Sequence, residues 1–88
     1  MTRKRVIVHG RVQGVFFRDA TQREALVAGI AGWVRNCRDG TVEAVFEGED
    51  FDVARMIDWT RHGPRHAEVD SVHVTDEEPE GLSGFEVR

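Results

Sequence analysis

Residues 10–18, Gly-Arg-Val-Gln-Gly-Val-Phe-Phe-Arg, combine residue types that suit the binding of a small anion. A β-branched run at Val6–Val8 leads into two glycines four positions apart, and Arg18 follows where the first turn of a helix is expected. N–H groups at a helix N-terminus lack partners within the helix, and the helix dipole favours negative charge there. The Arg18 guanidinium would add planar donors that match phosphate or carboxylate oxygens. The segment therefore predicts an oxyanion site, with phosphate as the favoured ligand.

Hydrophobic periodicity predicts the elements that must position this segment. Strands are expected at residues 4–12, 32–37, 41–47, 69–75 and 85–87, and helices at residues 16–29 and 49–62. Asp39-Gly40 indicates a two-residue hairpin turn. The order β-α-β-β-α-β predicts an α+β fold, a ferredoxin-like split βαβ sandwich with an antiparallel sheet and two helices on one face.

This order of elements brings a second polar residue to the anion site. The first strand ends at the glycine-rich loop, the helix runs back, and the second strand returns parallel to the first. Asn36 lies at the end of that second strand, so we expect it near Gln13–Arg18. An asparagine amide both donates and accepts hydrogen bonds and could hold an attacking water. Asparagine is equally common in the turn before a hairpin, and that interpretation stays open.

Several motifs of known phosphate-processing enzymes are absent, and this restricts the reactions that the site could catalyse. The loop is not followed by the Gly-Lys-Ser/Thr ending of a nucleotide-binding P-loop, and no cysteine precedes Arg18 as a phosphatase nucleophile would. No His or acidic cluster has the spacing of a metal site, so we expect none. Water would then be the direct nucleophile, and the leaving group must be a good one. A carboxylate qualifies, since its conjugate acid has a pKa near about 4, and this points to acyl phosphates.

Composition restricts the class of protein further. The chain has 88 residues and a formal net charge of −4, which predicts one domain, residues 1–88, and argues against a nucleic-acid binder. A lone Cys37 excludes an intrachain disulfide and favours the cytoplasm. No apolar stretch approaches transmembrane length, so no membrane partner is expected. Thr2–Arg5 is the one basic run, and it is expected to be a solvated tail or strand edge.

Two segments of the chain resemble the signature segments of the acylphosphatases. They are Gly10–Arg18 and Gly32-Trp33-Val34-Arg35-Asn36, and the Asp39–Glu43 and Gly63-Pro64 segments are similar as well. The resemblance implies a small, cofactor-free hydrolase of carboxyl phosphates, which we expect to be a monomer. It places the phosphate-binding arginine at Arg18 and the water-orienting asparagine at Asn36. The backbone amides that it assigns to the phosphate are those of Gln13, Gly14, Val15, Phe16 and Phe17.

Other interpretations compete with this one. A non-catalytic module that binds phosphate or acyl phosphate would need the same loop and Arg18 without turnover. An RNA-binding ferredoxin-like domain would use aromatic side chains to stack bases, but Phe16 and Phe17 lie at a helix start, where packing in the core is the usual role. The alternation in residues 41–47 also predicts that Glu43 and Glu47 face water.

Overall fold

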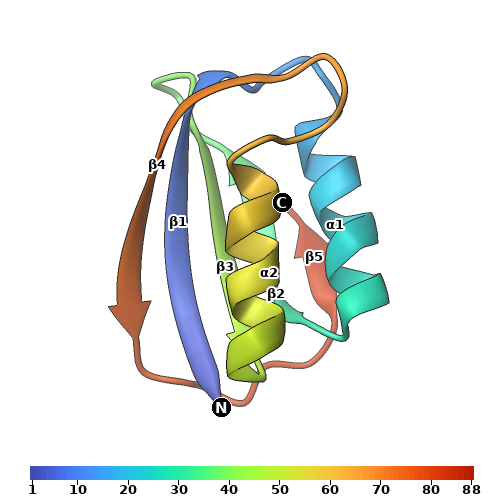
Figure 1. The fold of residues 1–88 in the computed structure, drawn as a ribbon, viewed down its shortest axis with the longest axis vertical. Coiled ribbons are helices and arrows are strands. Elements are labelled where there is room, and N and C mark those ends of the chain that lie inside the picture. The colour runs from blue at the N-terminus through green and yellow to red at the C-terminus, as the bar shows by residue number, and fades with distance from the viewer.

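The computed structural model describes residues 1–88 as a five-stranded sheet with two helices packed on one face (Figure 1). Along the chain the elements are β1 (Thr2–Arg11), α1 (Phe17–Ala28), β2 (Ala31–Asn36), β3 (Val42–Gly48), α2 (Asp50–Thr60), β4 (Glu68–Glu77) and β5 (Phe85–Val87). Their order in the sheet is β4-β1-β3-β2-β5. The predicted ferredoxin-like βαββαβ order is therefore confirmed, with β5 as an added edge strand. Neither helix is long and apolar enough to cross a membrane.

The edge strand β5 makes the sheet mixed, where an antiparallel sheet was predicted. β1, β2, β3 and β4 pair antiparallel, but β5 pairs parallel to β2 through Gly32–Val34. The reason is that β4 and β5 occupy opposite edges of the sheet, so the chain must cross its full width between them (Figure 1). We call this crossing segment, residues 78–84, the strap.

Helical and strand periodicity place the core between the helices and the sheet. In α1 the buried side chains are Phe17, Thr21 and Ala25, each one turn apart. Gly29 ends α1 in the left-handed conformation, with φ of 70°, as its position after the apolar stripe predicts. The β1 side chains Val6 and Val8 point into the same core and are fully buried. These contacts fix α1 across the sheet and so set where its N-terminus lies.

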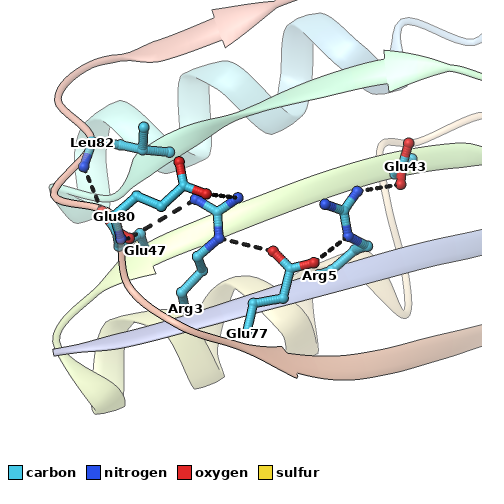
Figure 2. A network of polar contacts seen from close by, with 7 residues as sticks. All are labelled: Arg3, Arg5, Glu43, Glu47, Glu77, Glu80 and Leu82. Atoms are coloured by element: carbon cyan, nitrogen blue, oxygen red, sulfur yellow. Dashed lines mark hydrogen bonds and ion pairs between the residues drawn. The ribbon is translucent and has the colours of Figure 1, made fainter.

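The opposite face of the sheet carries charged side chains that were expected in water. Glu43 and Glu47 are only 8% and 2% exposed, and Arg3 from the supposed basic tail lies within β1 at 6% exposure. They belong to what we call the charged network, which is shown in Figure 2 and consists of Arg3, Arg5, Glu43, Glu47, Glu77 and Glu80. Alternation in one strand correctly separates two faces, but it does not show that neighbouring strands and the strap cover the second face.

Glu47 fastens the strap to the sheet within this network. Its two carboxylate oxygens accept the backbone N–H groups of Glu80 and Leu82, each at 2.6 Å (Figure 2). Burial opposes ionisation of Glu47, but these two hydrogen bonds and the charge of Arg3 outweigh it and hold its pKa below the ordinary value. Glu77 accepts from Arg5 Nε at 2.5 Å and Arg3 Nε at 2.8 Å, and these contacts lower its pKa as well.

Candidate functional site

The loop between β1 and α1 has an unusual backbone. Gly14 and Phe16 both adopt left-handed angles, with φ of 75° and 64°, and Phe16 is the one non-glycine residue with positive φ. Phe16 is also 77% exposed, whereas Phe17 is 2% exposed, so the expected core packing is correct for Phe17 and wrong for Phe16. Strained backbone of this kind costs about 1–3 kcal/mol and is concentrated at ligand sites. Nothing in the packing of Phe16 offsets that cost.

The same turn leaves a continuous row of hydrogen-bond donors. None of the hydrogen bonds within the chain is donated by a backbone N–H of residues 13–19, and the first helical donor is Ala20, which bonds Phe16 O at 3.0 Å. No side chain caps α1. A helix leaves its first few N–H groups without partners, and here the preceding loop extends the set. We call residues 13–19 the cradle, and its free N–H groups together with the helix dipole favour an anion.

A hollow of about 310 Å³, the first hollow, opens at the cradle. Its lining consists of Val12, Gly14, Phe16, Phe17, Arg18, Asp19 and Asn36. Arg18 comes from the first turn of α1 and Asn36 from the last position of β2, and both side chains are half-buried. Because β1 and β2 run in the same direction through β3, their ends lie at one edge of the sheet (Figure 1).

Two of the predicted site residues do not line the first hollow. Val15 is buried, at 7% exposure, and Gln13 turns its side chain away to donate from Nε2 to Cys37 O at 2.7 Å and Thr41 O at 2.9 Å. Through these bonds Gln13 ties the cradle to the loop that follows Asn36. That side-chain role is absent from the sequence prediction, which assigned only the backbone amide of Gln13. The lining residues Val12 and Asp19 carry no sequence signal that would have identified them.

The loop after Asn36 is longer than the predicted two-residue hairpin. It spans residues 37–41, closed by Cys37 N–H to Thr41 O at 2.9 Å. The Asp39 carboxylate accepts the hydroxyl of Thr41 at 2.6 Å and its N–H at 3.0 Å, and these bonds lower the Asp39 pKa. The side chain of Asp39 thus makes an extra turn within the loop, which the Asp-Gly pair alone does not reveal.

Arg18 is held in place without an Asp or Glu partner. Its Nη1 donates to the main-chain oxygen of Arg88, the last residue of the sequence, at 3.0 Å, and it forms no ion pair with an Asp or Glu side chain. This contact orients the guanidinium and uses one of its N–H donors. The remaining guanidinium donors stay available to an oxyanion in the first hollow.

Comparison with known proteins gives one consistent match. The family described as acylphosphatase matches residues 4–87. An acylphosphatase from Haloarcula marismortui is 53% identical over 87 residues, which is 99% of this chain and 96% of that protein. One from Rubrobacter xylanophilus is 57% identical over 88 residues, covering 98% of this chain and 79% of that protein. The crystal structure of acylphosphatase from Bacillus subtilis superposes with a TM-score of 0.97 at 37% identity, over 100% of this chain and 99% of that one.

Proposed function

The chain belongs to the acylphosphatase family, and from that premise we propose that the cradle and Arg18 bind the phosphoryl group while Asn36 positions the water that attacks it. It is a hydrolase with acylphosphatase activity, and its substrates are small acyl phosphates. What we propose is how the residues of this chain perform that reaction, and that they do so without a metal ion.

Binding of the phosphoryl group follows from the free donors. The N–H groups of residues 13–19 have no acceptor within the chain, and Arg18 pairs with no Asp or Glu side chain. The equatorial oxygens of a phosphoryl group would satisfy both at once. These donors are already oriented before substrate arrives, so they stabilise charge on those oxygens in the transition state without reorganisation.

Hydrolysis then needs only a correctly placed water. The Asn36 amide oxygen accepts a hydrogen bond from the water and thereby directs the water oxygen to phosphorus. A bond forms between the water oxygen and phosphorus, the bond from phosphorus to the acyl oxygen breaks, and its electron pair leaves on the carboxylate. The water proton passes to the phosphate oxygens or to the departing carboxylate. A carboxylate leaves readily because its conjugate acid has a pKa near about 4, so no protein base is required.

The observation that carries this proposal is the shared first hollow of Arg18, Asn36 and the unpartnered cradle. Hydrolysis of benzoyl phosphate in excess chelator tests it, with Arg18→Ala and Asn36→Ala compared with wild type. Arg23, an exposed residue of α1 without an ion pair, supplies the matched control Arg23→Ala. We expect activity in wild type and the control and large losses in the other two variants. Activity that disappears with chelator contradicts the metal-free reaction, and full activity in Asn36→Ala removes the role in placing water.

The site of attack can be tested separately with ¹⁸O-labelled water. Attack at phosphorus puts the label in inorganic phosphate and leaves the benzoate unlabelled. Label in benzoate would show attack at the carbonyl carbon and overturn the mechanism. Phosphate binding that depends on Arg18 without any turnover would instead support a non-catalytic binding module.

We also propose that residues 1–88 form a single domain that acts as a monomer in the cytoplasm without a nucleic-acid partner. The family match over residues 4–87, the net charge of −4 and the lone cysteine support this. The large exposed apolar side chains come from separate elements, among them Leu26 of α1, Phe51 of α2 and Val74 of β4. Light scattering after size exclusion tests the monomer, and a mass of twice 10.0 kDa contradicts it.

A further inference from the structure

A second hollow of about 400 Å³ adjoins the cradle. It shares Gly14 and Phe16 with the first hollow but contains neither Arg18 nor Asn36. Its other walls include Arg11 at the end of β1, Arg65 and His66 from the segment between α2 and β4, and Glu68 at the start of β4. The exposed ring of Phe16 therefore stands between the proposed phosphate site and a separate space.

The walls of the second hollow are fixed to the cradle by close packing. Gly10 lies so near β4 that a Cβ there would stand 2.1 Å from Glu68 O, which only glycine tolerates. Gly63 similarly packs on Phe17, where an added Cβ would be 2.6 Å from Cε2 of the ring. The segment that carries Arg65 thus packs on the start of α1 through Gly63, and it leads directly into the start of β4, which is seated against β1. Its residues Arg65 and His66 line one hollow together with Gly14 and Phe16 of the cradle.

The charges in this second hollow are not paired. Arg11 and Arg65 form no ion pair, in contrast to Arg3, Arg5 and Arg35 on the face of the sheet that carries the charged network. Glu68 is the one carboxylate in the lining and also forms no ion pair. Two guanidinium groups against one carboxylate leave the second hollow with a net positive lining, to which the imidazole of His66 adds two polar nitrogens.

We propose that the second hollow receives the acyl group of the substrate, and that Arg11 and Arg65 favour acyl groups that carry their own carboxylate or phosphate. This rests on the proposed function of the first hollow. In phosphoryl transfer the attacking and leaving oxygens lie roughly in line across phosphorus. With water at Asn36, the leaving carboxylate points away from Asn36, and the second hollow joins the cradle without including that residue. The acyl carbons would lie against Phe16.

A pair of substrates of equal length tests this selectivity. Succinyl phosphate and butyryl phosphate differ only in that a terminal carboxylate replaces a methyl group. The measurement is the ratio of their kcat/KM values for wild type, Arg65→Gln, Arg65→Lys and the double variant Arg11→Gln/Arg65→Gln. Arg61, exposed at the end of α2 and outside the second hollow, supplies the control Arg61→Gln.

We expect the ratio to fall about tenfold in the double variant and about threefold in Arg65→Gln, as for contacts between partly solvated charges. Arg65→Lys should retain most of the ratio, the control should retain all of it, and added salt should lower it in wild type. A ratio that stays constant in all variants, or that falls equally in the control, overturns the proposal. Butyryl phosphate separates the two hypotheses: if wild type does not hydrolyse it, or Arg18→Ala hydrolyses it normally, the proposed function itself fails.

Discussion

The cradle and the charged network use similar groups in opposite ways. In the network, Glu47 accepts two backbone N–H groups and Glu77 accepts from two arginines, so these carboxylates are satisfied within the chain. In the cradle, the N–H groups of residues 13–19 have no acceptor and Arg18 has no Asp or Glu partner. Charge satisfied within the chain supports the fold, whereas charge left unsatisfied at an open hollow is available to a ligand.

Solvent access explains why both arrangements are tolerated. A buried polar group without a partner costs about 1–3 kcal/mol, so the network must satisfy its members. One atom departs from this pattern, since the buried Arg3 Nη1 makes no hydrogen bond and lies 3.9 Å from Glu47 Oε1. The cradle opens into a hollow of about 310 Å³, where water can satisfy the same donors until substrate displaces it.

Arg18→Ala should lower the catalytic activity much more than the stability. We expect kcat/KM for benzoyl phosphate to fall about 10³-fold, equivalent to about 4 kcal/mol, because the charge opposite the phosphoryl oxygens is lost. The free energy of unfolding should fall by only about 1 kcal/mol, the value of the hydrogen bond to Arg88. Steady-state kinetics and urea titration measure the two effects. A stability loss as large as the activity loss would show that Arg18 belongs to the structural group.

Glu47→Gln should give the reverse result. A glutamine cannot accept both strap N–H groups and leaves Arg3 facing an uncharged neighbour, so the free energy of unfolding should fall by about 3 kcal/mol. Activity per folded molecule should stay within about twofold of wild type. Urea titration and kinetics at low temperature check both expectations, with the exposed Glu49→Gln as control. Equal stability in the two variants would contradict the anchoring role of Glu47.

Acid should weaken the network through the same carboxylates. The pKa values of Glu77 and Glu47 are lowered in the folded protein, the first by bonds to Arg5 and Arg3 and the second by strap N–H groups that outweigh its burial. Their stabilisation is present above the unfolded pKa, about 4.3, and is lost as pH falls through the lower folded values. Tm should therefore be steady near neutral pH and fall below about pH 4.3. The slope should be shallower in Glu47→Gln, and an identical slope would exclude Glu47 from the effect.

Phe16→Gly should have the smallest effect, and it tests whether the left-handed backbone of the cradle is strained. Glycine adopts φ of 64° without strain, so stability should rise by about 1 kcal/mol even though a large side chain is removed. The kcat/KM should fall, because Phe16 lines both hollows. Phe51→Gly is the matched control, an exposed phenylalanine within α2, and it should lower stability by about 1 kcal/mol. Thermal melts of wild type, Phe16→Gly and Phe51→Gly measure these changes in stability. A loss of stability in Phe16→Gly would contradict backbone strain at this residue.

Much of the fold was accessible from the sequence because local patterns determine it. The stripe Phe17, Thr21 and Ala25 and the stop at Gly29 predict α1 to within a residue. The order of elements also predicts that Asn36 and Arg18 come to one edge, where the structure places them in one hollow. These inferences need only periodicity and the direction of successive strands.

The remaining features depend on segments that meet only in the folded chain. Glu47 looks solvated because its strand alternates, yet the strap and Arg3 cover it. Phe16 resembles a core aromatic, and nothing local reveals that its backbone is left-handed and its ring exposed. Arg65 joins the second hollow only because the segment after α2 packs on Phe17 and the start of β4 packs on Gly10.

Two of the side-chain hydrogen bonds described above connect residues far apart in the chain. Arg3 and Glu77 are 74 residues apart, and Arg18 and Arg88 are 70 apart. Closing so long a loop costs conformational entropy before the contact can stabilise the chain. Folding is therefore slower than in a protein whose contacts are local. Interactions of this kind that form after the rate-limiting step mainly lower the rate of unfolding. The strap and its carboxylates would then govern how long a folded molecule lasts more than how quickly it forms.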